Sequence, residues 1–224
     1  NVVFDSLQLT EFDMFKDEIP KLHAIAEEIN LNHIKMSHRL MDGNLLFNIK
    51  KAIKEENIDF IVMGTSGAAG WQAFFLGTNT GNVLTAVDVP VLSVPSDAKF
   101  NKISTIGFTT RYREKDKKAL KSVLKIAKKT NAIVKCLYVK TNDSDVSPST
   151  IKQWEEEFVG EPIQFSLIPS DDVQDTILDF VLFKDIDVLA MLTYKRNFFV
   201  ELFKPSLTQK FSNRLGIPVL AMHE

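Results

Sequence analysis

The sequence predicts an α/β protein made of two tandem domains, each built on a parallel β-sheet. Three observations carry this prediction. In the second half of the chain, short apolar segments alternate with amphipathic helical segments, which is typical of a parallel sheet covered by helices. The second half also repeats the first at an offset of 128 positions. Finally, a glycine-rich loop in the first half lies between an apolar strand and a helix.

The internal repeat keeps one register over about 60 residues without a gap. Residues 89–94 align with residues 217–222, and residues 48–57 align with residues 176–185. A repeat of this length indicates two homologous domains, because the repeats of solenoid proteins are far shorter. We therefore expect one domain over residues 1–98 and a second over residues 99–224, each close to the common domain size.

Each expected strand of the second half but the last is followed by a helix. The expected strands span residues 103–109, 132–139, 162–168, 186–191 and 217–222, and the expected helices span residues 114–129, 148–158, 173–184 and 206–215. Crossovers between parallel strands are right-handed almost without exception. In such a sheet a ligand sits beyond the carboxyl ends of the strands, at the point where the strand order reverses.

The first half is shorter than the second. Its expected helices span residues 11–29, 45–56 and 79–86, and its expected strands span residues 34–40, 58–63 and 89–94. Pro20 would start or bend the first of these helices. At the offset of 128 positions, the counterpart of the strand near Ile103 falls before Asn1. We therefore expect the first domain to lack its first strand and helix here, with roughly 28–45 residues preceding Asn1 in the complete protein.

Composition is that of an ordinary globular protein, with 45% hydrophobic and 25% charged residues. No apolar run reaches the roughly 18–20 residues of a membrane-spanning helix, and we expect a cytoplasmic protein. Cys136 is the only cysteine, which excludes an internal disulfide. The basic stretch from Arg111 to Lys129 is compatible with nucleic-acid binding. The helical spacing of Leu120 and Leu124 favours the solvated face of an amphipathic helix instead, and we expect no nucleic-acid partner.

A glycine-rich loop in the first half is a candidate anion-binding site. It reads Gly64-Thr65-Ser66-Gly67, then nine residues, then Gly77-Thr78. The order of strand, loop and helix brings backbone N–H groups and a helix N-terminus to one place, where an anion such as phosphate can bind. The alternative is purely structural, with glycines as turn residues and Thr78 as a helix N-cap.

The second copy of this loop has lost these features. Leu192, Lys195 and Pro205 stand at the positions that correspond to the three glycines. Proline has no N–H to offer a phosphate. We therefore expect a degenerate site in the second domain. The apolar side chains of residues 198–203 would either pack over it or form an exposed patch for a partner.

The loop, the strand that ends in Met63 and the terminal Pro90-Val91-Leu92 strand resemble the universal stress protein family, as a tandem, UspA-like member. The resemblance covers nearly the whole chain. It implies Rossmann-like, adenine-nucleotide-hydrolase-like domains with sheet order 3-2-1-4-5, the first of them incomplete. It also implies a stress-response protein that binds ATP or a related adenine nucleotide, with Mg²⁺ as an accompanying ion.

The binding residues that this resemblance implies are Met63, Gly64, Gly67, Gly77, Thr78 and Asn79. The backbone of Met63 would contact the adenine edge. Gly64 and Gly67 would let the loop approach ribose and phosphates closely, because a Cβ there would obstruct them. Thr78 and the N–H of Asn79 would bind a phosphate. The family also places an aspartate after the first strand. Arg111 stands there in the second domain.

No catalytic pattern accompanies the loop. The Walker and nucleophile-elbow patterns are absent, so we expect a protein that is not an enzyme. His33 and His38 would face opposite sides of the expected strand, which argues against a joint metal site. Two alternatives stay open. One is an interaction protein with both sites non-functional. The other is a small enzyme of the ATP-pyrophosphatase kind, which would need carboxylates for Mg²⁺.

The expected partners are parts of the chain itself. The terminal strands at residues 89–94 and 217–222 are apolar, and each would be a sheet edge with unpaired backbone groups if left alone. In the family that the chain resembles, these strands meet antiparallel between domains. The sequence therefore predicts an intrachain pseudo-dimer of the two domains, which could assemble further into a homo-oligomer or bind an unidentified protein.

Overall fold

The computed structural model describes residues 6–31, 33–64, 78–95, 98–99, 102–193 and 216–223. The chain divides into two compact units, residues 1–48 and residues 49–224, with the boundary inside a helix. These units are groups of residues that lie close together in space, and they differ from the two expected domains. The expected domain boundary at residue 98 stays a prediction. Among the described residues, no helix is both long and apolar enough to cross a membrane.

The first unit consists of helix α1 (Ser6–Glu28), the segment after it and the start of the next helix. The expected helix over residues 11–29 is confirmed, and it begins five residues earlier. Pro20 lies inside this helix and does not start it. The helix ends because Asn30 adopts a left-handed backbone conformation, with φ of 57°. Leu31 N–H then donates to the carbonyl oxygen of Ala26, at 2.7 Å.

The prediction of a strand over residues 34–40 was wrong, since the backbone there is irregular. Its counterpart in the second half, β5 (Ile163–Pro169), forms a strand by pairing with β4 (Ile133–Lys140). Among the described residues of the first unit there is no strand with which residues 34–40 could pair. Because a strand is stabilised by its ladder of hydrogen bonds, an apolar pattern without a partner does not form one.

The second unit is built on one seven-stranded sheet with the order β1-β2-β7-β6-β3-β4-β5. The strands not yet given are β1 (Ile61–Gly64), β2 (Val91–Val94), β3 (Thr105–Thr109), β6 (Val188–Leu192) and β7 (Val219–Met222). The five strands of the second half are parallel and stand in the order 3-2-1-4-5 when numbered along that half. The expected α/β class and strand order are therefore confirmed there.

The helices follow the expected pattern closely. They are α2 (Leu45–Glu56), α3 (Thr78–Ala86), α4 (Glu114–Thr130), α5 (Pro148–Glu157) and α6 (Val173–Phe183). The helix expected over residues 206–215 lies outside the described residues. At the offset of 128 positions, α2 corresponds to residues 173–184 and β2 to residues 219–222, which agree with α6 and β7 within one residue.

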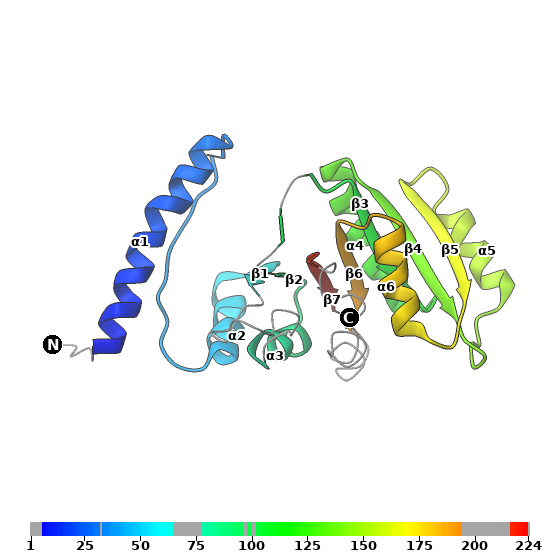
Figure 1. Cartoon of the computed structure of the whole chain (residues 1–224), viewed down its shortest axis with the longest axis horizontal. Helices are drawn as coiled ribbons and strands as arrows, with labels where there is room; N and C mark the ends of the chain where they lie inside the picture. The colour runs from blue at the N-terminus through cyan, green and yellow to red at the C-terminus, as the bar shows by residue number, and fades with distance from the viewer. Residues whose placement is uncertain are drawn as a thin grey trace. The chain divides into compact units, whose positions relative to one another are not determined.

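The sheet of the second half is covered on both faces. One hydrophobic cluster joins α4 and α5 to one face, around Phe108, Leu120 and Trp154. Helix α6 covers the other face (Figure 1). Cys136 is buried in the first cluster, and burial raises the pKa of its thiol. An inert thiol was expected at this position.

The basic stretch of the second half is the solvated face of α4, as expected. Its buried positions are Asp116, Ala119, Leu120, Val123, Leu124 and Ala127. The Nζ atoms of Lys117 and Lys121 lie 2.8 and 2.9 Å from the carboxylate of Glu157. Lys128 pairs with Glu161 at 2.7 Å. These lysines therefore have acidic partners within the fold.

The two halves of the chain meet between the second and third strands of the sheet. Strand β2 of the first half pairs antiparallel with β7 of the second, with Leu92 opposite Leu220. Beyond the ladder, a nitrogen of the His223 ring, Nε2, lies 2.7 Å from the carbonyl oxygen of Leu84 in α3. The sheet of the second unit therefore contains strands from both halves of the chain.

Candidate functional site

The predicted anion site of the first half is framed by the end of β1 and the start of α3. Strand β1 ends at Gly64 and α3 begins at Thr78. The hydroxyl of Thr80, in the first turn of α3, donates a hydrogen bond of 3.3 Å to the carbonyl oxygen of Gly64. Thr80 is buried, at 4% exposed. The helix N-terminus is therefore held against the strand end.

This arrangement favours a negative charge. The first N–H groups of a helix have no acceptor within the helix, and the helix dipole makes that end positive. The first turn of α3 contains no acidic residue that would compensate it. A Cβ built on Gly64 would meet no described atom within 4 Å, so the described residues leave the space beside this glycine open.

The structure places the predicted binding residues as follows. Met63 is partly buried in β1, which is the edge strand of the described sheet, and Gly64 closes that strand. The backbones of Thr78 and Asn79 form the first turn of α3, and their side chains lie outside the described residues. Gly67 and Gly77 also lie outside the described residues.

The second half contains a pocket at the place where the sequence predicted a degenerate site. Its volume is about 340 Å³, and it lies at the carboxyl ends of β3, β4 and β6. Strand β3 is the point where the strand order of this half reverses, since β4 lies on one side of it and β6 on the other. Ligands of parallel α/β sheets bind at this place. The residues expected to pack over it, 198–203, lie outside the described residues.

The pocket is lined by side chains of three kinds. Arg111, Arg113, Asp143 and Asp145 carry charge, and Thr109, Thr110, Thr141 and Ser144 carry hydroxyls. The remaining lining residues are Leu137, Tyr138, Val139, Val146, Val173, Ile177, Met191 and Leu192. The pocket thus combines an apolar interior with a small set of polar groups, which is typical of small-molecule sites.

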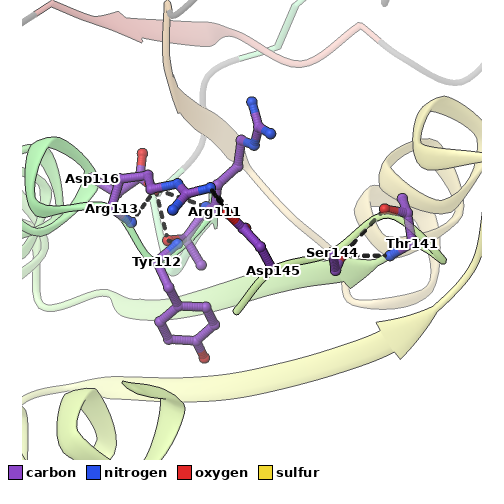
Figure 2. A network of polar contacts seen from close by, with 8 residues as sticks. Arg111, Tyr112, Arg113, Asp116, Thr141, Ser144 and Asp145 are labelled. Atoms are coloured by element: carbon purple, nitrogen blue, oxygen red, sulfur yellow. Dashed lines mark hydrogen bonds and ion pairs between the residues drawn. The ribbon is translucent and has the colours of Figure 1, made fainter. Parts of the chain in front are cut away.

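The carboxylate of Asp116 organises one wall of the pocket (Figure 2). It accepts hydrogen bonds from the backbone N–H groups of Arg111 and Arg113, at 2.7 and 3.1 Å, and from the hydroxyl of Thr110, at 3.2 Å. Asp116 is 1% exposed. Because buried acceptors with several donors hold a loop in one conformation, the backbone of Arg111 is fixed.

A second wall is formed by the loop between β4 and α5. Arg113 donates to both carboxylate oxygens of Asp145, at 2.7 and 2.8 Å. This hydrogen bond from Arg113 lowers the pKa of Asp145. In the same loop, the N–H of Thr141 donates to the hydroxyl oxygen of Ser144 at 2.9 Å (Figure 2). The pair of Arg113 and Asp145 therefore neutralises two of the four charged lining groups.

The sequence offered weak signals for these residues. Asp116 stands at the third position of α4, where an acidic side chain can reach back to cap the helix start. Thr80 had no signal, because only the approach of α3 to β1 gives its hydroxyl an acceptor. The contact of His38 with His23, 3.2 Å between their Nε2 atoms, was also not predicted. Among the described residues, no three His, Cys, Asp or Glu side chains come together in a way that could hold a metal ion.

Comparisons with known proteins agree with this architecture. The model of the universal stress protein family matches residues 6–95. A solved universal stress protein from Archaeoglobus fulgidus DSM 4304 has a TM-score of 0.70 and 20% identity, covering 99% of this chain and 81% of that one. A functionally unknown protein from Pseudomonas aeruginosa PAO1 has a TM-score of 0.69 and 12% identity, covering 91% and 77% of the two chains. No curated protein matches the sequence.

Proposed function

We propose that this chain, whose residues 6–95 belong to the universal stress protein family, binds one adenine nucleotide at the glycine-rich loop of its first half. ATP or a related adenine nucleotide is the ligand, and its occupancy regulates a stress response. The second half does not bind this ligand. The protein acts by binding, without a catalytic step of its own.

The observation that carries the proposal is the hydrogen bond from the Thr80 hydroxyl to the carbonyl oxygen of Gly64. It supports a phosphate site because it fixes the start of α3 beside the end of β1, with the loop between them. The loop holds Gly67 and Gly77 in its sequence, and neither residue would obstruct a phosphate with a side chain.

The second half differs at each of these points. Leu192 ends β6 where Gly64 ends β1, so a branched side chain replaces an open position. Pro205 removes an N–H from the corresponding helix start. Arg111 stands where the family has an aspartate near the adenine and ribose. These differences support one nucleotide site per chain.

We also propose that the two domains form an intrachain pseudo-dimer. The antiparallel ladder of β2 with β7 supports this proposal, since it pairs the last strand of one half with the last strand of the other. Because β2 and β7 pair with each other, neither strand leaves an open edge with which a strand of another chain could pair.

Isothermal titration calorimetry of the full-length protein with ATP and Mg²⁺ tests the nucleotide site. We expect one site per chain. Gly67→Val should abolish binding, because the branched side chain would occupy the space that the phosphates approach. Lys195→Ala is the matched control, since it changes the corresponding position of the second copy, and it should leave binding unchanged.

Other outcomes would contradict the proposal. Two sites per chain, or a site that survives Gly67→Val, would show that the loop does not hold the nucleotide. No binding at all would favour the interaction protein with two non-functional sites. Turnover of ATP to AMP and pyrophosphate would favour the enzymatic alternative.

A further inference from the structure

We propose that the pocket of the second half binds a small organic anion, a molecule with one carboxylate or phosphate group and an apolar body. This site is distinct from the nucleotide site of the first half and goes beyond the function proposed above. Loss of the aspartate and the glycines would then have changed the specificity of the second half, and the pocket would have been kept.

The size of the pocket sets the size of the ligand. A volume of about 340 Å³ lies near the lower end of the range of about 300–1,000 Å³ that is usual for ligand pockets. The floor is apolar, because Leu137, Ile177 and Met191 line it and are at most 2% exposed. A compact apolar group fits this floor.

Arg111 supplies the charge that recognises the anion. Its guanidinium has no ion-pair or hydrogen-bond partner among the described residues, whereas Arg113 is paired with Asp145. Figure 2 shows the Arg111 side chain extending away from that pair. Because Asp116 holds its backbone N–H at 2.7 Å, this arginine is presented from a fixed point of the wall. A guanidinium binds carboxylates and phosphates in a forked geometry.

A buried hydroxyl gives independent support for a polar ligand. Tyr138 lines the pocket and is 4% exposed, and its hydroxyl has no hydrogen-bond partner among the described residues. Buried polar groups are almost always paired with a protein group, water or ligand. A ligand with oxygen atoms in the pocket would supply acceptors close to this residue.

The same charges disfavour a polyphosphate. Of the four charged lining residues, Arg113 and Asp145 pair with each other, which leaves the guanidinium of Arg111 and the carboxylate of Asp143. One unpaired guanidinium matches one anionic group, and further negative charge would meet the acidic side chains. The pocket therefore selects against ATP while it accepts a ligand with a single anionic group.

Two fluorescent probes separate charge recognition from apolar burial. 1-Anilinonaphthalene-8-sulfonate has an apolar body and one anionic group, and N-phenyl-1-naphthylamine has the same body without the charge. We expect saturable binding of the sulfonate at one site of the full-length protein. The protein should bind the sulfonate roughly tenfold or more tightly than the neutral amine. A hydrogen bond to a charged group contributes a free energy of this order to binding.

Variants locate the site. Arg111→Gln should lower the affinity for the sulfonate about tenfold and leave that for the amine unchanged. Arg39→Gln is the matched control, because it removes the same charge outside the pocket, and it should change neither affinity. Val173→Phe should weaken both probes, since Val173 lines the pocket at the partly exposed start of α6. Gly67→Val should leave both probes bound, which separates this site from the nucleotide site.

Three results would overturn the proposal. The first is equal affinity of the two probes in the unchanged protein. The second is binding of the sulfonate that neither Arg111→Gln nor Val173→Phe weakens. The third is displacement of the sulfonate by ATP in the Gly67→Val variant, which would make the pocket a second nucleotide site. Competition by benzoate and by phenyl phosphate then distinguishes the two kinds of anionic group, and the tighter competitor names the ligand class.

Discussion

The hydroxyl of Ser93 donates a buried hydrogen bond of 3.1 Å to the carbonyl oxygen of Val219, 126 positions later in the chain. The two residues face each other across the antiparallel ladder of β2 and β7. The contact therefore joins the two halves of the chain within one sheet.

Removal of this hydroxyl should weaken the whole fold. We expect Ser93→Ala to lower the free energy of unfolding by about 1–2 kcal/mol, because a buried carbonyl loses a donor. Urea denaturation measures the change. Ser122→Ala is the control, since the hydroxyl of Ser122 is exposed and makes only a 3.4 Å contact within α4. Equal effects of the two substitutions would show that the contact between the halves contributes nothing.

Asp116→Ala should destabilise the second half more strongly. The substitution leaves two backbone N–H groups and the Thr110 hydroxyl without their buried acceptor. We expect a loss of about 2–4 kcal/mol in the free energy of unfolding. Asp145→Ala removes an exposed carboxylate from the same wall and should cost much less, because solvent screens its pair with Arg113. Thermal and chemical unfolding of both variants checks the difference, and the reverse ranking would refute our account of the loop.

The ion pairs of Glu157 should make stability depend on pH. The hydrogen bond from Lys117, and then that from Lys121, lowers the pKa of Glu157 below its ordinary value of 4.5. A lowered carboxyl pKa contributes stability above the unfolded-state value, and this contribution is lost as pH falls through the folded-state value. At pH 7, Glu157→Gln should therefore be less stable than the unchanged protein by no more than about 1 kcal/mol.

The difference between these two proteins should vanish in acid, once Glu157 is protonated in both states. Urea denaturation at several values between pH 7 and pH 3 measures it. Glu155→Gln, on the same helix, serves as the control for removal of a charge. A difference that stays constant down to pH 3 would rule out the ion pairs as its cause.

Gly107 allows close packing between β3 and the start of β6. A Cβ on this residue would lie 3.0 Å from Cγ2 of Ile186 and 3.3 Å from Cδ1 of Leu189. We expect Gly107→Ala to cost about 1–3 kcal/mol through overpacking. Combination with Ile186→Ala removes the nearest atoms, so the two effects should be less than additive. Additive losses in a double-mutant cycle would exclude overpacking as the reason.

Local patterns were sufficient for most of the secondary structure. Helix α2 and helix α6 begin and end within one residue of the predicted positions, since their apolar residues recur with helical spacing. The repeat also determined which strands correspond between the halves. The strand order of the second half follows from the family that the sequence resembles, and the sheet confirms it.

The prediction from the sequence was wrong where a predicted strand had no neighbouring strand to pair with. Residues 34–40 have the apolar pattern of a strand, yet Ile34 and Leu40 are 47% and 49% exposed and the backbone is irregular. Periodicity describes the side chains of one segment. Whether that segment becomes a strand depends on a second segment that supplies hydrogen bonds.

The sequence by itself determined the fold class, the two-fold repeat and the asymmetry between an intact glycine loop and a degenerate one. These properties lie in the order and spacing of residues that are close along the chain. The tertiary structure alone decided the lining of the pocket in the second half and the pairing of Arg113 with Asp145. Arg113 and Asp145 are 32 positions apart in the sequence, and Ser93 and Val219 are 126 positions apart. Such contacts form only after the sheet has brought the ends of its strands together, because a side chain's partners are set by packing and not by its neighbours in sequence.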